Sequence, residues 1–447
     1  MKKKMDEAIN ISGKVIDNWL PLKIGYDHTP GAVVCIAVNG VPKYLQAFGV
    51  SNIEEQTPLQ TDAQFRVASM SKMFTAVAIL QLQEKGKLRL DDKVSDYLSW
   101  FNGKSKQTDL KNVTLRQLLS HNAGIWRDGQ AKQWLNDKFP TKLEGTMSTK
   151  SIVFENGTTF KYSNHGYSIL GSLIEHITDK SYGEYVTDEI IAPLKLKNTL
   201  PDLPEEVPKK LVPGYKRWVP DMTERLTEPQ IKTNAYAPAT GFISNAKDLS
   251  VFLASLHVES KKSVLSRESR KLMMQVQGII EDDERYGLGI SLDTISGQLT
   301  YGHSGGFAGY ITNAVAEPNS NIQVVVLTNT QSNTAWQVSN NIIRLVAKIV
   351  KDNNATYLES EPYSGVYRSR WGDMVAVSLG DYLVTFTPAA ANPVQAGTIL
   401  KKIKQHTYSN SKEKGFGIPG ETVTFSDIKD GKAATVVSDS NVLYRVY

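Results

Sequence analysis

The stretch RVASMSKMFTAV, residues 66–77, places two serines, Ser69 and Ser71, ahead of Lys72. A serine hydroxyl becomes a nucleophile when a base lies close enough to accept its proton. Residues three apart on a helix share a face, whereas neighbours do not, so Lys72 can face Ser69 but points away from Ser71. A helix start at Ser69 would also favour negative charge that develops there. The spacing therefore favours Ser69 as a nucleophile with Lys72 as its base, and Ser71 as a packing or supporting residue.

The Ser-x-x-Lys spacing is weak on its own because it occurs five times, beginning at positions 69, 244, 409, 411 and 426. A serine that caps a helix, followed by a surface lysine, explains such a pair without any chemistry. Lys72 differs in its context, because its neighbours in MSKMFTAVAIL are mostly apolar and burial there would lower its pKa and make it a usable base. The other four pairs fit polar loops, a helix start or hairpin strands.

A second group, Tyr162-Ser163-Asn164, comes just before the amphipathic pattern HGYSILGSLIEH. A tyrosine beside a lysine can shuttle protons, and an asparagine amide can hold a substrate amide. The alternative is a helix cap with a packed aromatic side chain. The same tripeptide recurs at 408–410, within TYSNSKEK, and we expect a loop there because this segment is charged and lacks a helical pattern.

A third group, His303-Ser304-Gly305-Gly306 in YGHSGGFAGY, lies on a predicted strand close to its turn. Glycines at this place let a ligand approach the backbone, and exposed N–H groups can bind an oxyanion. The alternative is a glycine-rich turn that carries a surface histidine.

These groups need elements that bring them together. Residues 4–20 have helical spacing, and 31–52 reads as two strands joined at Asn39-Gly40. The pattern from 69 to about 200 is mostly helical, and strands return between 286 and 329, followed by a helix. This order predicts one α/β (α+β) unit, in which an antiparallel sheet combines early and late strands around an inserted helical region.

The end of the chain changes character. The polar segment before Pro362 reads as a linker, and the alternating patterns after it, with a turn at Asp430-Gly431, predict a small all-β barrel or sandwich. The predicted domains are therefore 1–352, carrying the three groups, a linker at 353–362, and a β domain at 363–447.

Composition excludes several other classes. The net charge of +5 is scattered and argues against a nucleic-acid partner. The sequence contains no run of about 18 apolar residues, so no membrane span is predicted. One cysteine, Cys35, excludes an internal disulfide, and no Cys/His cluster has zinc spacing, so we expect neither metal nor cofactor. The start lacks a signal peptide, so the chain as it stands is expected in the cytoplasm, or in the periplasm or medium if a signal has been removed.

Together the three groups, in this chain order, resemble the motifs of serine β-lactamases and penicillin-recognising peptidases. The resemblance covers about residues 20–350 and points to the class C-like branch, which contains D-alanyl-D-alanine carboxypeptidases, D-aminopeptidases and related esterases. The C-terminal domain resembles lipocalin-like barrels that are appended to some of these peptidases, where they border the active site or mediate oligomers.

The resemblance implies a role for each residue. Ser69 would be acylated, Lys72 and Tyr162 would exchange protons, and Asn164 would hold the substrate amide. The N–H groups of Ser69 and Gly306 would bind the oxyanion, and His303, followed by Ser304 and Gly305, would replace the lysine usual in the β-lactamases of this branch.

The function expected from this resemblance is hydrolysis of short peptides, including peptides with D-residues, by an aminopeptidase or a D-Ala-D-Ala carboxypeptidase. A carboxylesterase or a β-lactamase of the same fold remains an alternative, as does a non-catalytic protein that binds penicillin or peptides. The expected partners are thus a small peptide, ester or β-lactam, and a homo-oligomer is compatible with the same resemblance.

Overall fold

The computed structural model describes residues 2–446 apart from 105–108, 131, 147–150, 223, 282–283, 352–361, 380–381, 392, 394–396, 412–418 and 439–440. The chain forms two compact units, one of residues 31–339 and one of residues 1–30 with 340–447. The predicted linker, 353–362, lies outside the described residues except for Pro362. The predicted domain boundaries therefore stay predictions. In the described part, no helix combines the length and the apolar character needed to cross a membrane.

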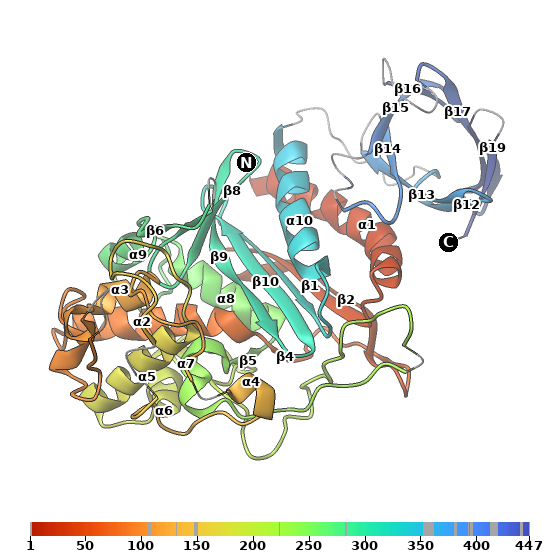
Figure 1. The fold of residues 1–447 in the computed structure, drawn as a ribbon. Helices are drawn as coiled ribbons and strands as arrows, with labels where there is room; N and C mark the ends of the chain where they lie inside the picture. Colours follow the sequence, from red (N-terminus) through yellow and green to blue (C-terminus); the bar gives the residue numbers. More distant parts are fainter. Residues whose placement is uncertain are drawn as a thin grey trace. The chain divides into compact units, whose positions relative to one another are not determined.

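The unit of residues 31–339 is built on a nine-stranded antiparallel sheet in the order β3-β2-β1-β11-β10-β9-β8-β7-β6 (Figure 1). The early strand β1 pairs with the late strand β11, with Ala32 opposite Thr328, which confirms the predicted sheet. Asn39 and Gly40 form the turn between β1 and β2 with positive φ angles of 53° and 72°, as a tight hairpin turn requires. The strands are β1 (Gly31–Val38), β2 (Val41–Asn52), β3 (Thr57–Pro58), β6 (Gly278–Ile279), β7 (Arg285–Tyr286), β8 (Ser291–Ile295), β9 (Gln298–Phe307), β10 (Tyr310–Glu317) and β11 (Ile322–Thr328).

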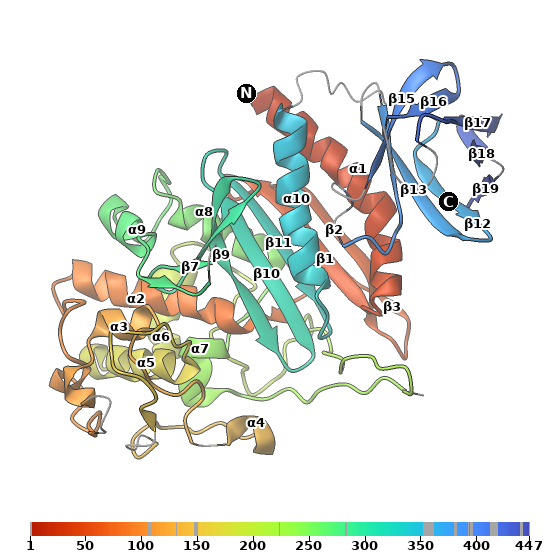
Figure 2. The same cartoon turned by 45° about the horizontal axis from the view of Figure 1, so that its top comes forward.

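The described elements between residues 68 and 191 are all helical, as the sequence predicts. They are η1 (Ala68–Met70), α2 (Ser71–Glu84), η2 (Val94–Asp96), η3 (Leu110–Asn112), α3 (Leu115–Leu119), α4 (Gln133–Asn136), α5 (Asn164–Thr178), α6 (Tyr182–Val186) and the π-helical turn η5 (Thr187–Ile191). The later helices are η6 (Asn234–Tyr236), α7 (Ala237–Thr240), α8 (Ala246–Leu256) and α9 (Arg267–Met273). The short strands β4 (Phe65–Arg66) and β5 (Ile243–Ser244) pair separately. Helix α8 packs on β1, β10 and β11 and covers one face of the large sheet (Figure 2).

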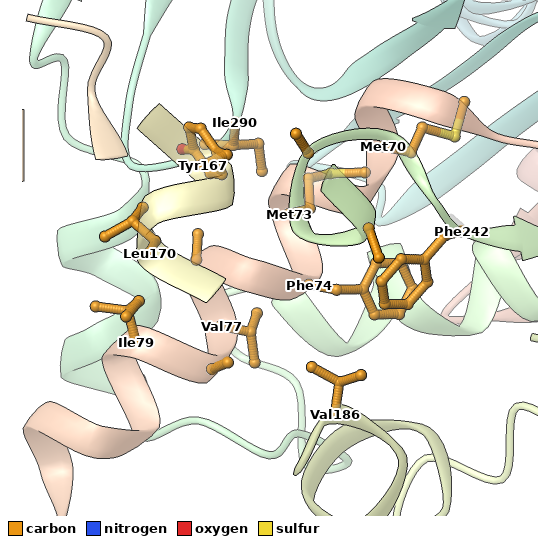
Figure 3. Close-up of a cluster of buried hydrophobic side chains, with 14 of the residues drawn as sticks. Met70, Met73, Phe74, Val77, Ile79, Tyr167, Leu170, Val186, Phe242 and Ile290 are labelled. Atoms are coloured by element: carbon orange, nitrogen blue, oxygen red, sulfur yellow. The ribbon is translucent and has the colours of Figure 1, made fainter. Parts of the chain in front are cut away.

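Helix α2 is the buried centre of this unit, since every residue from Ser71 to Leu82 is removed from solvent. A helix that is apolar on all sides must be packed on all sides. Phe74 stacks on Phe242 and Phe252, with ring centroids 4.4 and 3.7 Å away, and Figure 3 shows Phe74 and Phe242 within this cluster. The packing of α2 consequently carries Lys72, near its first turn, into the interior.

The second unit contains the predicted β domain, which is a closed eight-stranded barrel. Its described interior is filled by buried side chains, among them Tyr363, Tyr408 and Phe425. The loop predicted at 408–410 is wrong, because these residues belong to a strand whose Tyr408 faces the barrel interior. The strands are β12 (Gly365–Ser369), β13 (Gly372–Leu379), β14 (Tyr382–Phe386), β15 (Thr398–Lys404), β16 (Thr407–Asn410), β17 (Thr422–Lys429), β18 (Lys432–Ser438) and β19 (Asn441–Arg445).

The second unit also holds α1 (Lys2–Tyr26) and, from Asn340 onward, α10 (Thr334–Lys351). The indole Nε1 of the buried Trp19 donates a hydrogen bond of 3.1 Å to the carbonyl of Pro388. The first helix is thereby attached to the loop that follows β14.

Candidate active site

Ser69 lies in the 3₁₀ turn η1, directly before α2. The preceding residue, Ala68, has a φ of +48°, a left-handed conformation that non-glycine residues rarely adopt. Ser71 supports this turn, because its hydroxyl donates to the carbonyl of Ala68 and accepts from the N–H of Phe242 at 3.0 Å. The structure thus gives Ser71 a local supporting contact, while Lys72 approaches the other serine.

The side chain of Lys72 reaches Ser69 from the first turn of α2. Its Nζ lies 3.1 Å from Ser69 Oγ and also donates to Asn164 Oδ1 at 2.7 Å and to the Ala239 carbonyl at 2.8 Å. Complete burial holds the pKa of Lys72 well below its ordinary value of 10.5, although the negative charge of Asp128 opposes the shift. The three acceptors offset part of the cost of burying an ammonium, so Lys72 can exchange a proton without being exposed.

Tyr162 approaches the same serine from the start of α5. Its hydroxyl donates to Ser69 Oγ at 2.8 Å, and Lys72 Nζ lies 4.7 Å from the centre of its ring. Burial raises the pKa of Tyr162, so the phenol keeps its proton at neutral pH. The Ser69 hydroxyl therefore has a buried amine and a protonated phenol within hydrogen-bond distance.

The first residues of α5 are fixed by their caps. Ser163 caps the helix through the N–H of Gly166 at 2.9 Å and donates to the carbonyl of Trp126 at 2.6 Å. Asn164 accepts from Lys72 through Oδ1 and donates through Nδ2 to Asp128 Oδ1 at 2.6 Å. Asn164 consequently links the buried amine to a carboxylate that the sequence motifs do not include.

Strand β9 carries the third group. His303 is buried, accepts from the Tyr286 hydroxyl through Nε2 at 3.0 Å, and donates through Nδ1 to the carbonyl of Ser304 at 2.6 Å. Burial, together with the charge of Lys72, lowers the pKa of His303 to about 3, so the imidazole is neutral. The alternative of a surface histidine on a turn is wrong, and β9 presents no cation at this position.

The adjacent glycines Gly305 and Gly306 of β9 differ in their surroundings. A Cβ on Gly305 would lie 2.1 Å from the carbonyl oxygen of Val67, so β9 runs against the chain just before Ser69. Ser304 and Gly306 alternate with the buried residues of β9 and are exposed. The structure thus brings Ser69, Lys72, Tyr162 and Asn164 into direct contact and places β9 alongside.

A further residue under this cluster is His121. Its buried ring lies 4.3 Å from the Tyr162 ring, and its Nδ1 accepts from the Ser163 N–H at 3.1 Å. Neither His121 nor Asp128 stands out in the sequence, because each reaches the cluster only through residues that are 36 or more positions away. Among the described residues, no group of three His, Cys, Asp or Glu side chains is arranged to hold a metal ion.

Comparisons with known proteins identify the family and the fold. A family model described as Beta-lactamase matches residues 22–348. Penicillin-binding protein 4 from Amycolatopsis lactamdurans is 28% identical over 318 residues, which are 68% of this chain and 81% of that protein. The region matched by the family model, residues 22–348, contains all of the residues described above around Ser69.

Solved structures are similar over comparable or longer spans. The octameric penicillin-binding protein homologue from Pyrococcus abyssi has a TM-score of 0.64 and 23% identity, covering 95% of this chain and 97% of that chain. The D-amino acid amidase from Ochrobactrum anthropi SV3, complexed with D-phenylalanine, has a TM-score of 0.63 and 20% identity, and the match covers 75% of this chain and 98% of that chain. At these identities the likeness establishes the fold alone.

Proposed function

The chain belongs to the beta-lactamase family, and from this membership we propose that it is a serine hydrolase with Ser69 as its nucleophile. Family and fold support a hydrolase. The choice of nucleophile rests on one observation, that Lys72 Nζ and the Tyr162 hydroxyl lie 3.1 and 2.8 Å from Ser69 Oγ.

The reaction proceeds through an acyl-enzyme. Neutral Lys72 accepts the proton as Ser69 attacks an amide or ester carbonyl, and the N–H groups of Ser69 and Gly306 receive the oxyanion. The proton then passes through Tyr162 to the leaving group, and water releases the acyl product by the reverse route. The lowered pKa of Lys72 supports the first step, and the raised pKa of Tyr162 supports its role as a donor.

The substrates that we propose are short peptides or aminoacyl amides, including those with D-residues, held through Asn164 and Ser304. The likeness to a D-amino acid amidase and to a penicillin-binding protein supports this choice over a simple ester. A panel of D- and L-aminoacyl p-nitroanilides, p-nitrophenyl esters and nitrocefin tests it. Preference for nitrocefin or for the esters over every anilide would contradict it.

Ser69→Ala tests the nucleophile, since it should lower kcat/KM on the best substrate of that panel by at least about 1,000-fold. Ser71→Ala is the matched control, because it removes a hydroxyl from the same turn without removing the attacking atom. Similar losses in both variants would contradict the assignment.

We also propose that the chain forms a homo-oligomer. The Pyrococcus abyssi homologue is octameric, and the barrel of this chain leaves Trp371 79% and Tyr444 62% exposed. Light scattering coupled to gel filtration would show a mass above 49.5 kDa, and a monomer at micromolar concentration would refute the proposal.

A further inference from the structure

We propose that Asp128 binds the free α-ammonium of the substrate's first residue, and that Trp134 packs against that residue's side chain. The proposal rests on the proposed function, because it assigns the substrate class of the same site. It makes the enzyme specific for unblocked aminoacyl amides and peptides cleaved after their first residue, with an apolar or aromatic side chain.

Asp128 is held in a defined position. Its Oδ1 accepts from Asn164 Nδ2 at 2.6 Å and from the indole Nε1 of Trp134 at 3.2 Å. Its backbone carbonyl accepts from the Tyr236 hydroxyl and from Gln133 Nε2, both at 2.7 Å. Four donors therefore fix both the backbone and the side chain, which is the preorganisation that a recognition group needs.

The second carboxylate oxygen of Asp128 is the one available to a ligand. The side chain is 28% exposed, and the partner near Oδ2 is Arg127 Nε at 3.4 Å, whose own side chain is 65% exposed. An ion pair this exposed is weak because water screens it and the arginine loses side-chain freedom. A substrate ammonium that reaches Oδ2 can bind beside Arg127 or displace it.

Asp128 also lies close to the proposed proton relay. Its neighbour Asn164 contacts Lys72, which contacts Ser69, so one amide side chain separates the carboxylate from the proposed proton relay. The ammonium of an aminoacyl substrate is separated from the scissile carbonyl by a single carbon. Asp128 is, moreover, the carboxylate whose charge acts on both Lys72 and Tyr162.

Trp134 supplies the wall beside this carboxylate. Its indole is 40% exposed and packs edge-on against Phe139 and Phe307, with ring centroids 4.9 and 5.5 Å away. Phe307 directly follows Gly306 on β9. Phe139 and Phe307 thus hold the partly exposed indole of Trp134 in place. Trp134 contacts both Asp128 and the end of β9, the strand that would supply an N–H group to the oxyanion.

Asp128→Asn is the sharpest test, since it keeps an acceptor for Asn164 and Trp134 and removes only the charge. The probes are the faster-cleaved enantiomer of phenylalanine p-nitroanilide and its deamino analogue, 3-phenylpropionyl p-nitroanilide. We expect kcat/KM for the first to fall by about 10- to 100-fold more than that for the second, since any effect of the lost charge on Lys72 and Tyr162 is common to both probes. Asp137→Asn, an exposed aspartate of the same segment, controls for long-range charge and should leave both rates unchanged.

Equal losses on both probes would overturn the proposal, because Asp128 would then act only through Asn164. No loss on either probe would overturn it too, as would a wild-type enzyme that prefers the deamino analogue or cleaves neither. Failure of the proposed function is distinguishable, since hydrolysis would then persist in Ser69→Ala. Trp134→Ala gives a second measurement and should lower the preference for phenylalanine over alanine p-nitroanilide by about 10-fold. An unchanged preference would refute the role of Trp134.

Discussion

Gly305→Ala should disable the enzyme while leaving its catalytic side chains in place. The new Cβ would lie 2.1 Å from the carbonyl oxygen of Val67 and 2.5 Å from Thr312 Oγ1. Ordinary carbon–oxygen contacts begin near 3.3 Å, so β9 and the turn before Ser69 must separate by roughly 1 Å. Because the proposed oxyanion site takes one N–H from each of these segments, the separation acts directly on it.

A misplacement of about 1 Å at a reacting centre costs on the order of 100-fold in rate. We therefore expect kcat/KM on the best p-nitroanilide to fall by about 100-fold, which corresponds to about 2.7 kcal/mol of transition-state stabilisation. Overpacking should also lower the free energy of unfolding by about 1–3 kcal/mol, measured by urea titration.

Gly183→Ala in α6 is the matched control, since the nearest atom to its added Cβ would be 3.5 Å away and its φ is ordinary. This variant should keep full activity and gain slightly in stability. If Gly305→Ala kept an activity within threefold of wild type, the geometric argument would be refuted. The added Cβ would then not have separated β9 from the turn before Ser69 enough to disturb the oxyanion site.

Three other predictions follow from the same cluster. As the pKa of Lys72 lies well below 10.5, kcat/KM should rise with pH as the amine loses its proton and level off well before pH 10; a rate still rising there would contradict the base assignment. The pKa of His303 is lowered to about 3 from 6.5, so between these values the unfolded chain binds a proton that the folded chain excludes. Acidification should therefore lower the free energy of unfolding, and at pH 5 His303 alone should account for a loss of about 2 kcal/mol. His303→Gln should show a flatter pH dependence of stability in urea titrations. An unchanged dependence would count against a buried neutral imidazole. Ser71→Ala leaves the Phe242 N–H without its acceptor and should cost about 1–3 kcal/mol of stability without abolishing turnover, whereas unchanged stability would show that the contact is dispensable.

The sequence predicts those features that local patterns encode. The alternation of apolar and polar residues, together with turn residues, predicts the sheet and the barrel, because side chains on a strand point alternately to its two faces. Asn39-Gly40 permits the tight turn between the first two strands. The spacing of Ser69 and Lys72 predicted their contact because residues three apart share a helical face.

Other features depend on contacts that no local pattern carries. His303 is buried by Tyr286 and its surroundings rather than by its own strand, so a surface position could not be excluded from sequence. Asp128 joins the site through Asn164, which lies 36 residues further along the chain. The left-handed conformation of Ala68 is equally hidden, because alanine gives no sign of it and the Ser71 hydroxyl that supports it is held by Phe242, from a distant part of the chain.

The most direct test of the central claim is the mass of the covalent adduct formed with a fluorophosphonate, mapped to a single residue by peptide mass spectrometry. Our account predicts one adduct per chain on Ser69, present in Ser71→Ala and absent from Ser69→Ala. An adduct on another residue, or one that persists in Ser69→Ala, would contradict it.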